Sequence, residues 1–251
     1  MRQRGLFVVL ACFVNCCLPC AWTVSPTADE MAEAQRWAAT ALTGDPSAGP
    51  VFSFLYDGKP SREVLAACTF TQEESNLDDI RTKRTHRWTD AKTGIEVRCV
   101  SVSYGDFPVV EWTVYLRNTG TTDTPLIENI QGLDVRWERE EGGEFVLRGI
   151  KGDYCVPDSY EPYEITLAPN VVQQFAPEGG RPTNKAFPCY NLAMPGGGVI
   201  LAIGWPGQWA MRFTRDGARA LQTVAGQEVT HLRLKPGEEI RTRLMALLFW
   251  K

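Results

Sequence analysis

The sequence VVEWTVYLR, residues 109–117, alternates between apolar and polar side chains and decides the fold class of this chain. Successive side chains of a strand point to opposite faces, so one face of this segment is apolar: Val110, Trp112, Val114 and Leu116. Glu111, Thr113 and Arg117 fall on the other face. The pattern predicts a strand with one buried side and one solvated side, as in an antiparallel sheet.

The same period of two recurs on both sides of this segment, from Val51 onward. It is present in residues 94–104, 126–137, 229–234 and 240–250, whereas residues 198–203 are apolar throughout and are expected to be buried on both faces. Turn sequences separate these segments: Asp57-Gly58, Asn118-Thr119-Gly120, Glu141-Gly142-Gly143, Pro195-Gly196-Gly197, Asp216-Gly217 and Lys235-Pro236-Gly237. Short strands with such turns between them indicate antiparallel pairing.

These patterns predict an all-β fold over residues 51–251. A single sheet of about a dozen strands would expose one apolar face, so a large antiparallel two-sheet sandwich is expected. The proline-rich residues 157–188 are expected to form surface loops over the sandwich, or else a loop layer that shapes a binding or docking surface.

One short N-terminal helix is expected before the strands. Thr27 and Glu30 have the spacing of a capping box, and apolar residues recur at helical intervals up to Gly44. The pattern predicts a helix over about residues 28–43, followed by a Gly- and Pro-rich linker. Residues 22–50 are thus assigned to the helix and linker.

Residues 1–21 have the order of a signal peptide. Arg2 and Arg4 precede an apolar run over residues 6–18, which is broken at Pro19-Cys20-Ala21. An exported protein, periplasmic or extracellular, is expected, with no membrane attachment after cleavage. An uncleaved anchor and a lipoprotein are the alternatives. The net charge of −4 becomes −6 without the two leader arginines, and no long basic run exists, so nucleic-acid binding is not expected.

The mature chain keeps four cysteines: Cys68, Cys99, Cys155 and Cys189. Export permits disulfides, and four cysteines allow three full pairings, among which the sequence does not choose. They could equally be small buried hydrophobic residues. No two are spaced as a C-x-x-C pair and the chain has only two histidines, so neither a metal site nor a cofactor is expected.

Catalytic residues are not expected in this chain, which lacks the compact motifs of hydrolases and nucleotide-binding enzymes. His86 and His231 could act as acid and base, as in mutarotase-like sandwiches, but the strand pattern predicts that both are solvated. Carboxylates at Asp106, Glu111, Glu128 and Asp134 are candidates for glycoside hydrolysis. Residues of this type also occupy the wet face of any sheet.

Tryptophans are the other candidates, because aromatic faces can stack on sugar rings. Four of the eight lie near turns or strand ends, where exposure is plausible: Trp88, Trp137, Trp205 and Trp209. Packing in the core is the expectation for Trp112 and Trp250. Packing is also favoured over exposure for Trp205 and Trp209, because Gly204 and Gly207 permit a close backbone approach.

Several segments, in this order and spacing, resemble the N-terminal β-supersandwich domain of family-36 glycoside hydrolases, the α-galactosidase family. They are PVFSF (50–54), DGKPS (57–61), DFPVVEW (106–112), NTGT (118–121), PLIENIQ (125–131), GGVILAIGW (197–205) and PGEEIRTRLMALLFW (236–250). The resemblance implies a galactose-mutarotase-like supersandwich. In that family a catalytic barrel follows this domain and carries the two catalytic aspartates, so no catalytic residue is carried over to this chain.

The resemblance also implies which partners and contacts to expect. A catalytic barrel or a second copy of the chain could pack on the domain, and an α-galactoside or another carbohydrate could be bound. A loop of the domain can reach the rim of a substrate site, and the candidates here are Tyr56, Asp57, Lys59 and Trp88.

The leading hypothesis is a non-catalytic domain of an α-galactosidase-like protein, from a truncated chain or one retained alone, with a structural, oligomerising or carbohydrate-contacting role. A free-standing exported carbohydrate-binding module is the second hypothesis. A mutarotase or epimerase is the third.

Overall fold

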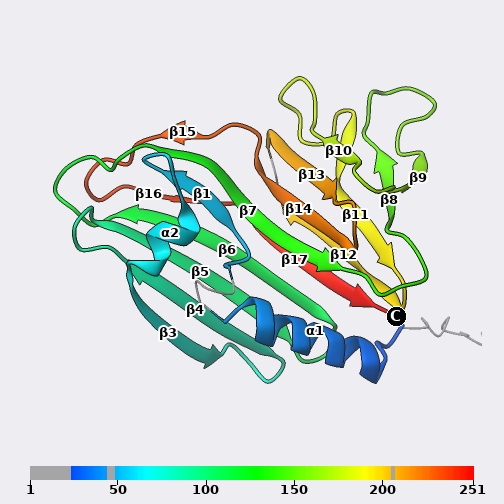
Figure 1. Ribbon diagram of the computed structural model, residues 1–251, viewed down its shortest axis with the longest axis horizontal. Helices are drawn as coiled ribbons and strands as arrows, with labels where there is room; N and C mark the ends of the chain where they lie inside the picture. Colours follow the sequence, from blue (N-terminus) through cyan, green and yellow to red (C-terminus); the bar gives the residue numbers. More distant parts are fainter. Residues whose placement is uncertain (1–23, 44–48, 205–206) are drawn as a thin grey trace, which may run out of the picture.

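Two antiparallel sheets stacked face to face form the body of the molecule (Figure 1). The computed structural model describes residues 24–43, 49–204 and 207–251. Every strand pair within the two sheets is antiparallel. The predicted two-sheet, all-β architecture is therefore confirmed. No helix in the described part of the chain is long and apolar enough to cross a membrane.

The smaller sheet has seven strands in the order β10-β13-β14-β7-β1-β2, with β15 also paired to β7. Its strands are β1 (Ser53–Tyr56), β2 (Lys59–Pro60), β7 (Ile127–Glu138), β10 (Val172–Phe175), β13 (Trp209–Arg215), β14 (Ala220–Gln227) and β15 (His231–Leu232).

The larger sheet has ten strands in the order β3-β4-β5-β6-β17-β12-β11-β8-β9, with β16 also paired to β6. Its strands are β3 (Thr69–Asn76), β4 (Arg81–Thr89), β5 (Ile95–Tyr104), β6 (Val109–Asn118), β8 (Val146–Lys151), β9 (Pro162–Thr166), β11 (Ala186–Met194), β12 (Gly197–Gly204), β16 (Glu239–Arg241) and β17 (Leu244–Trp250).

The core lies between the sheets and is centred on β6, the strand with the clearest sequence pattern. Its four predicted inward side chains are exposed by 1% or less: Val110, Trp112, Val114 and Leu116. The Trp112 indole N–H donates to the Gly132 carbonyl of β7 at 2.7 Å and so ties the two sheets together.

Helix α1 (Ala28–Ala41) covers part of the inner face of the ten-stranded sheet, against β17 and β6. The predicted capping box is present: the Glu30 amide donates to Thr27 Oγ1 at 3.2 Å, and the Thr27 amide donates to Glu30 Oε2 at 2.7 Å. The end of β17 lies beside this helix, because the Lys251 amide donates to Glu30 at 3.2 Å. A second short helix, α2 (Ser61–Ala66), was not expected and buries Leu65.

Two expectations about other segments need correction. Residues 157–188 do not consist of loops alone, since β9 and β10 lie within them. Residues 198–203 are not buried on both faces. Val199, Leu201 and Ile203 point into the core, whereas Ile200 and Ala202 on the outer face are half-buried, because the seven-stranded sheet covers only the inner face.

The predicted turn at Asp57-Gly58 is the two-residue loop of the β1–β2 hairpin, in which Tyr56 pairs with Lys59. Asp57 has φ 53° and Gly58 has φ 74°. Positive φ at both central residues is the requirement of the tight hairpin turns that favour Asp-Gly.

Candidate functional site

The four predicted carbohydrate contacts do not form one accessible group. Tyr56 and Trp88 are 4% and 1% exposed, so their side chains face the core and offer no ring face to a sugar. Trp88 packs against Phe70 at a centroid distance of 5.3 Å and against Phe52 at 5.7 Å. Both residues lie on the inward side of their strands, so the exposure considered for Trp88 is absent in the structure. Asp57 and Lys59 are exposed at the hairpin, and their contact with a carbohydrate stays a prediction.

The two histidines lie on different sheets. His86 on β4 was expected to be solvated, but it is 4% exposed and packs beside Phe70 and Trp88, because it lies on the same face of β4 as Trp88. Burial, helped by the nearby Arg84 charge, lowers the pKa of His86. His231 on β15 is exposed as predicted and lies 2.9 Å from Glu128. The structure does not bring the two imidazoles together as an acid–base pair.

The candidate carboxylates also have separate surroundings. Glu111 accepts a hydrogen bond from the Tyr104 hydroxyl at 3.1 Å, Glu128 contacts His231, and Asp134 accepts one from Gln222. Asp106 lies in the exposed turn before β6. These contacts give no sign of a shared proton or a catalytic carboxylate pair.

The tryptophans near turns or strand ends, for which exposure was plausible, are core residues where the structure describes them, as packing had been favoured for Trp209. Trp137 and Trp209 are 6% and 0% exposed, while Trp205 lies outside the described residues. Trp250 was expected to be in the core but is half-buried on the outer face of the ten-stranded sheet. Its indole N–H donates to Asn191 at 2.9 Å, and its ring covers Gly198, where a Cβ atom would lie 2.4 Å from the indole.

The four cysteines are unpaired. Burial raises the pKa of Cys99 to about 12 and, together with the Asp90 charge, that of Cys68 to about 11. Neither thiol is therefore activated as a nucleophile. Within residues 24–43, 49–204 and 207–251, no cluster of three or more His, Cys, Asp or Glu side chains could hold a metal ion.

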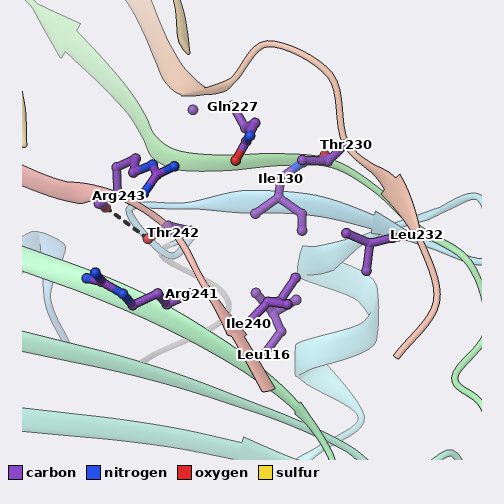
Figure 2. Close-up of a pocket in the computed structure, with 10 residues that line it drawn as sticks. Leu116, Ile130, Gln227, Thr230, Leu232, Ile240, Arg241, Thr242 and Arg243 are labelled. Atoms are coloured by element: carbon purple, nitrogen blue, oxygen red, sulfur yellow. Dashed lines mark hydrogen bonds between the residues drawn. The ribbon is translucent and has the colours of Figure 1, made fainter. Parts of the chain in front are cut away.

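One pocket opens between the two sheets at the end of the sandwich where β17 begins (Figure 2). We call it the arginine pocket. Its cavity volume is about 290 Å³. Both sheets contribute to its lining: Leu116, Ile130, Gly226, Gln227, Thr230, Leu232, Ile240, Arg241, Thr242 and Arg243.

Polar and apolar groups are separated in this pocket. Figure 2 shows Arg243 on one side, toward Gln227, and an apolar group on the other, whereas the side chain of Arg241 points away from both. Arg241 pairs with the outward Tyr115 of β6, so its side chain lies on the outer face of the ten-stranded sheet. The apolar group consists of Leu116, Ile130, Leu232 and Ile240. No acidic residue lines the pocket, and neither arginine forms an ion pair with any residue that the structure describes.

The strands around the arginine pocket are irregular. Arg241 pairs with Tyr115 of β6, and Met245 pairs with Trp112. Three residues lie between the first two positions but only two between their partners on β6, so a β-bulge with one extra residue precedes β17. Thr242 fills this bulge: its hydroxyl accepts from the Val114 amide and donates to the Arg243 carbonyl, both at 3.0 Å.

A second irregularity lies across the pocket, where β14 meets β7. The register shifts between Ala225 and Gly226, and a Cβ atom at Gly226 would lie 2.4 Å from the Ile130 carbonyl oxygen. On β7, Asn129 adopts φ 50°. Bulges and left-handed residues re-aim nearby side chains and are concentrated at functional sites. Their position here places Gln227 and Arg243 at the pocket mouth.

A second opening lies at the opposite end of the sandwich, where β17 ends. We call it the tryptophan opening. Its cavity volume is about 440 Å³, and Trp37, Trp137, Phe249 and Trp250 are among its lining residues. Trp37 stacks on Trp112 at 5.8 Å and on Trp137 at 6.2 Å, so neighbouring rings already cover it.

Several charges at and behind the tryptophan opening are paired within the chain. Arg139 contacts Glu144 at 3.2 Å, and Glu144 contacts the fully buried Arg215 at 2.9 Å. Partial burial of Glu144 disfavours its charged form, but hydrogen bonds from Arg215 and the Phe145 amide outweigh this and lower its pKa. Arg215 also donates to Asp216 and to the Ala218 carbonyl, both at 2.7 Å. This network supports the fold.

Several solved α-galactosidase structures contain the same fold. The galactosidase domain of the α-galactosidase–sucrose kinase AgaSK matches with a TM-score of 0.61 and 15% identity, covering 80% of this chain and 30% of that one. The family-36 α-galactosidase AgaB from Geobacillus stearothermophilus matches with a TM-score of 0.60 and 12% identity, with coverage of 80% and 30%. An α-galactosidase from Lactobacillus brevis matches with a TM-score of 0.62 and 12% identity, with coverage of 80% and 29%.

This chain has the fold of one domain of the family-36 α-galactosidases. The fold that the sequence resemblance implied is thus confirmed, and the coverage agrees with an N-terminal domain without the barrel. The chain spans about 30% of the length of the structures it matches. No family model and no curated protein sequence matches it.

The residues of the arginine pocket were not identified from the sequence. Arg241 and Arg243 were read as ordinary members of one strand over residues 240–250. Two arginines on either side of a threonine, at the start of an otherwise apolar strand, were the available signal. Gln227 carried no comparable signal.

Proposed function

We propose that this chain is the non-catalytic sandwich domain of an α-galactosidase-like glycoside hydrolase, and that the outer face of its ten-stranded sheet packs on a further domain. The observation that carries this proposal is the apolar character of that outer face along β17 and β12. Four outward residues illustrate it: Ile200, Ala202, Ala246 and Leu248.

These four residues form a continuous patch, because Ile200 pairs with Leu248 and Ala202 with Ala246 across the β12–β17 ladder. All four are half-buried in the chain alone. A sheet face that meets water normally carries polar side chains, and a contiguous apolar patch marks an interaction surface.

The outer face of the ten-stranded sheet is polar on the strands near its β3 edge. On β4 and β5, the outward Arg87 and Arg98 both contact Glu96, at 2.6 and 3.3 Å. The apolar character is therefore confined to the central strands, where another layer of protein would cover it.

The first experiment measures the state of the purified chain by size-exclusion chromatography with light scattering and by binding of a hydrophobic dye. An uncovered docking face is expected to bind the dye and to cause self-association. The double variant Ile200→Glu/Leu248→Glu is expected to be monomeric and to bind less dye, whereas Thr71→Glu on exposed β3 is the matched control. A monomeric wild-type chain that binds no dye would contradict the docking role.

An activity assay tests the non-catalytic part of the proposal. Incubation with raffinose or melibiose is expected to release no galactose, since the described residues bring no carboxylate pair together. Galactose release that survives repurification would overturn it.

Carbohydrate binding is the second candidate function, and the arginine pocket favours it. An apolar wall beside a few convergent polar groups is the usual make-up of a small-molecule site. Calorimetric titration with galactose, raffinose and melibiose is the direct measurement, and no heat with any sugar tested would count against this role.

Export is proposed on the basis of residues 1–21, which lie outside the described residues. Expression in a host with a secretory pathway, followed by mass measurement of the protein in each fraction, tests it. A mature protein that lacks the leader is expected outside the cytoplasm, and a full-length cytoplasmic product would contradict export.

A further inference from the structure

We propose that the arginine pocket binds a carboxylated pyranose, a hexuronate, either free or as the terminal unit of an acidic glycan. This inference rests on the carbohydrate-binding role and adds a chemical class of ligand to it. It is independent of the docking role of the outer sheet face, which lies on other residues.

The first argument is charge. Arg243 brings a positive charge to a pocket without acidic lining residues, in a chain whose formal net charge is −4, and Arg241 adds a second charge nearby on the outer face of the same sheet. The acidic residues next to the lining residues are already engaged: Glu239 accepts from Arg98 at 2.6 Å, and Glu228 accepts from Gln208 at 2.7 Å. The Arg243 guanidinium thus remains available for an external anion in the pocket. Guanidinium favours carboxylate because two parallel hydrogen bonds can form.

The second argument is the opposite wall. Ile130, Leu232 and Ile240 form an apolar surface within reach of the same cavity. A pyranose ring has an apolar face of C–H groups that can pack on such a wall, while its hydroxyl groups remain at the edge. Gln227 and Thr230 lie at the mouth and can bond with these hydroxyls.

The third argument is size. The cavity volume of about 290 Å³ lies at the lower end of the range for small-molecule sites. It therefore suits one sugar unit rather than a buried oligosaccharide. Its position at the end of the sandwich, with the exposed Gln227 in its lining, allows a longer glycan to continue into solvent.

The backbone around the pocket agrees with a binding role. A regular ladder would have avoided the extra residue at Thr242 and the left-handed Asn129. Such irregularities persist where the surrounding structure holds them, and they are concentrated at ligand sites.

The test is calorimetric titration of the full purified chain with D-galacturonate, with D-galactose and with acetate. Galacturonate and galactose differ only at C6, where a carboxylate replaces a hydroxymethyl group. We expect galacturonate to bind roughly tenfold or more tightly than galactose, the gain of one charge-assisted interaction. Acetate, which lacks the ring, is expected to bind more weakly than galacturonate.

Arg241→Gln/Arg243→Gln is expected to remove the preference for galacturonate over galactose. Arg212→Gln, an exposed arginine of β13 outside the pocket, is the matched control and is expected to keep it. Circular dichroism verifies that each variant is folded. Digalacturonate distinguishes a free hexuronate from the terminal unit of an acidic glycan. If digalacturonate binds more tightly than galacturonate, the ligand is a glycan end, and if the two bind equally, it is a free sugar acid.

Three outcomes would overturn the inference: equal binding of galacturonate and galactose, equal binding of acetate and galacturonate, or a preference for galacturonate that survives the double arginine variant. If galactose binds and galacturonate shows no advantage, the carbohydrate-binding role stands while the hexuronate inference fails. If no sugar binds, both fail, and the docking role is still decided separately by light scattering.

Discussion

The two openings between the sheets differ in how far their lining side chains already have partners within the chain. The tryptophan opening is the larger one and has the residue types that often bind sugars, but its Trp37 ring is covered by neighbouring rings and several of its charges are paired, such as Arg139 with Glu144. The arginine pocket is smaller, and its two guanidinium groups have no acidic partner in the described chain. If the arginine pocket binds a ligand as proposed, side chains without partners, rather than residue type or cavity size, distinguish a binding site from a structural opening in this fold.

The strongest test of this contrast is Trp37→Ala. If the tryptophan opening is a structural seam, loss of this ring removes contacts with Trp112, Trp137 and Phe249 and lowers the free energy of unfolding by roughly 3 to 4 kcal/mol. Chemical denaturation followed by circular dichroism measures it. Gln35→Ala, an exposed change on the same helix, is the control. A loss below about 1 kcal/mol for Trp37→Ala would mean that the ring is not structural.

Arg215→Gln tests the ion-pair network behind the same opening. The Arg215 side chain is 0% exposed and contacts Glu144 and Asp216. Removing one partner of a buried pair leaves the other charge unsatisfied, and a loss of about 3 kcal/mol is expected in the same denaturation experiment. Arg212→Gln on the same strand is exposed and should change stability by less than about 0.5 kcal/mol. Equal effects of the two variants would contradict the role of the network.

His86 allows a test by pH at another buried position, beside the C-terminal end of α1. Burial lowers its pKa from the ordinary value of 6.5, so the unfolded chain binds a proton more readily than the folded chain. The contribution of neutral His86 to the free energy of unfolding is therefore fully present above pH 6.5, and it is lost as the pH falls from 6.5 through the lower pKa of the folded state. Denaturation midpoints measured from pH 7.5 down to pH 5 should fall more in the wild type than in His86→Leu. Parallel pH profiles would show that this histidine is not responsible.

The smallest effect is expected at the arginine pocket. Arg241→Gln/Arg243→Gln should leave the free energy of unfolding within about 0.5 kcal/mol of the wild-type value, because neither side chain supports an ion pair of the fold. The denaturation series that includes Trp37→Ala and Arg215→Gln supplies the comparison. A loss near that of Arg215→Gln would show that the pocket arginines are structural, and the contrast between the two openings would disappear.

Much of the fold could be predicted from the sequence because its determinants are local. The period of two in β6 fixed its inward face, Asp57-Gly58 fixed a hairpin, and Thr27 with Glu30 fixed the start of α1. Trp88 and His86 were misplaced because a single strand does not show which of its faces meets the other sheet. Trp250 was misplaced for the converse reason, since its apolar ring lies on an outward position.

The candidate site could not be predicted because it depends on long-range register. Arg243 enters the pocket through a bulge defined by the pairing of β16 and β17 with β6, more than a hundred residues earlier in the chain. Gln227 lines the same pocket as Arg243 only because β14 pairs with β7 in a shifted register. Neither pairing leaves a pattern in the residues near it.

The position of β17 has a consequence for how the chain reaches its folded state. This strand lies between β6 and β12, so it joins the half of the sheet built from β3 to β6 to the half built from β8, β9, β11 and β12. Until β17 is synthesised and inserted, both halves present an unpaired edge strand to solvent, and edges of this kind invite pairing with other chains. Folding during translation is therefore expected to stay incomplete and slow, as for other sheets with non-local pairing, and a chaperone that shields the two edges should raise the yield of soluble protein.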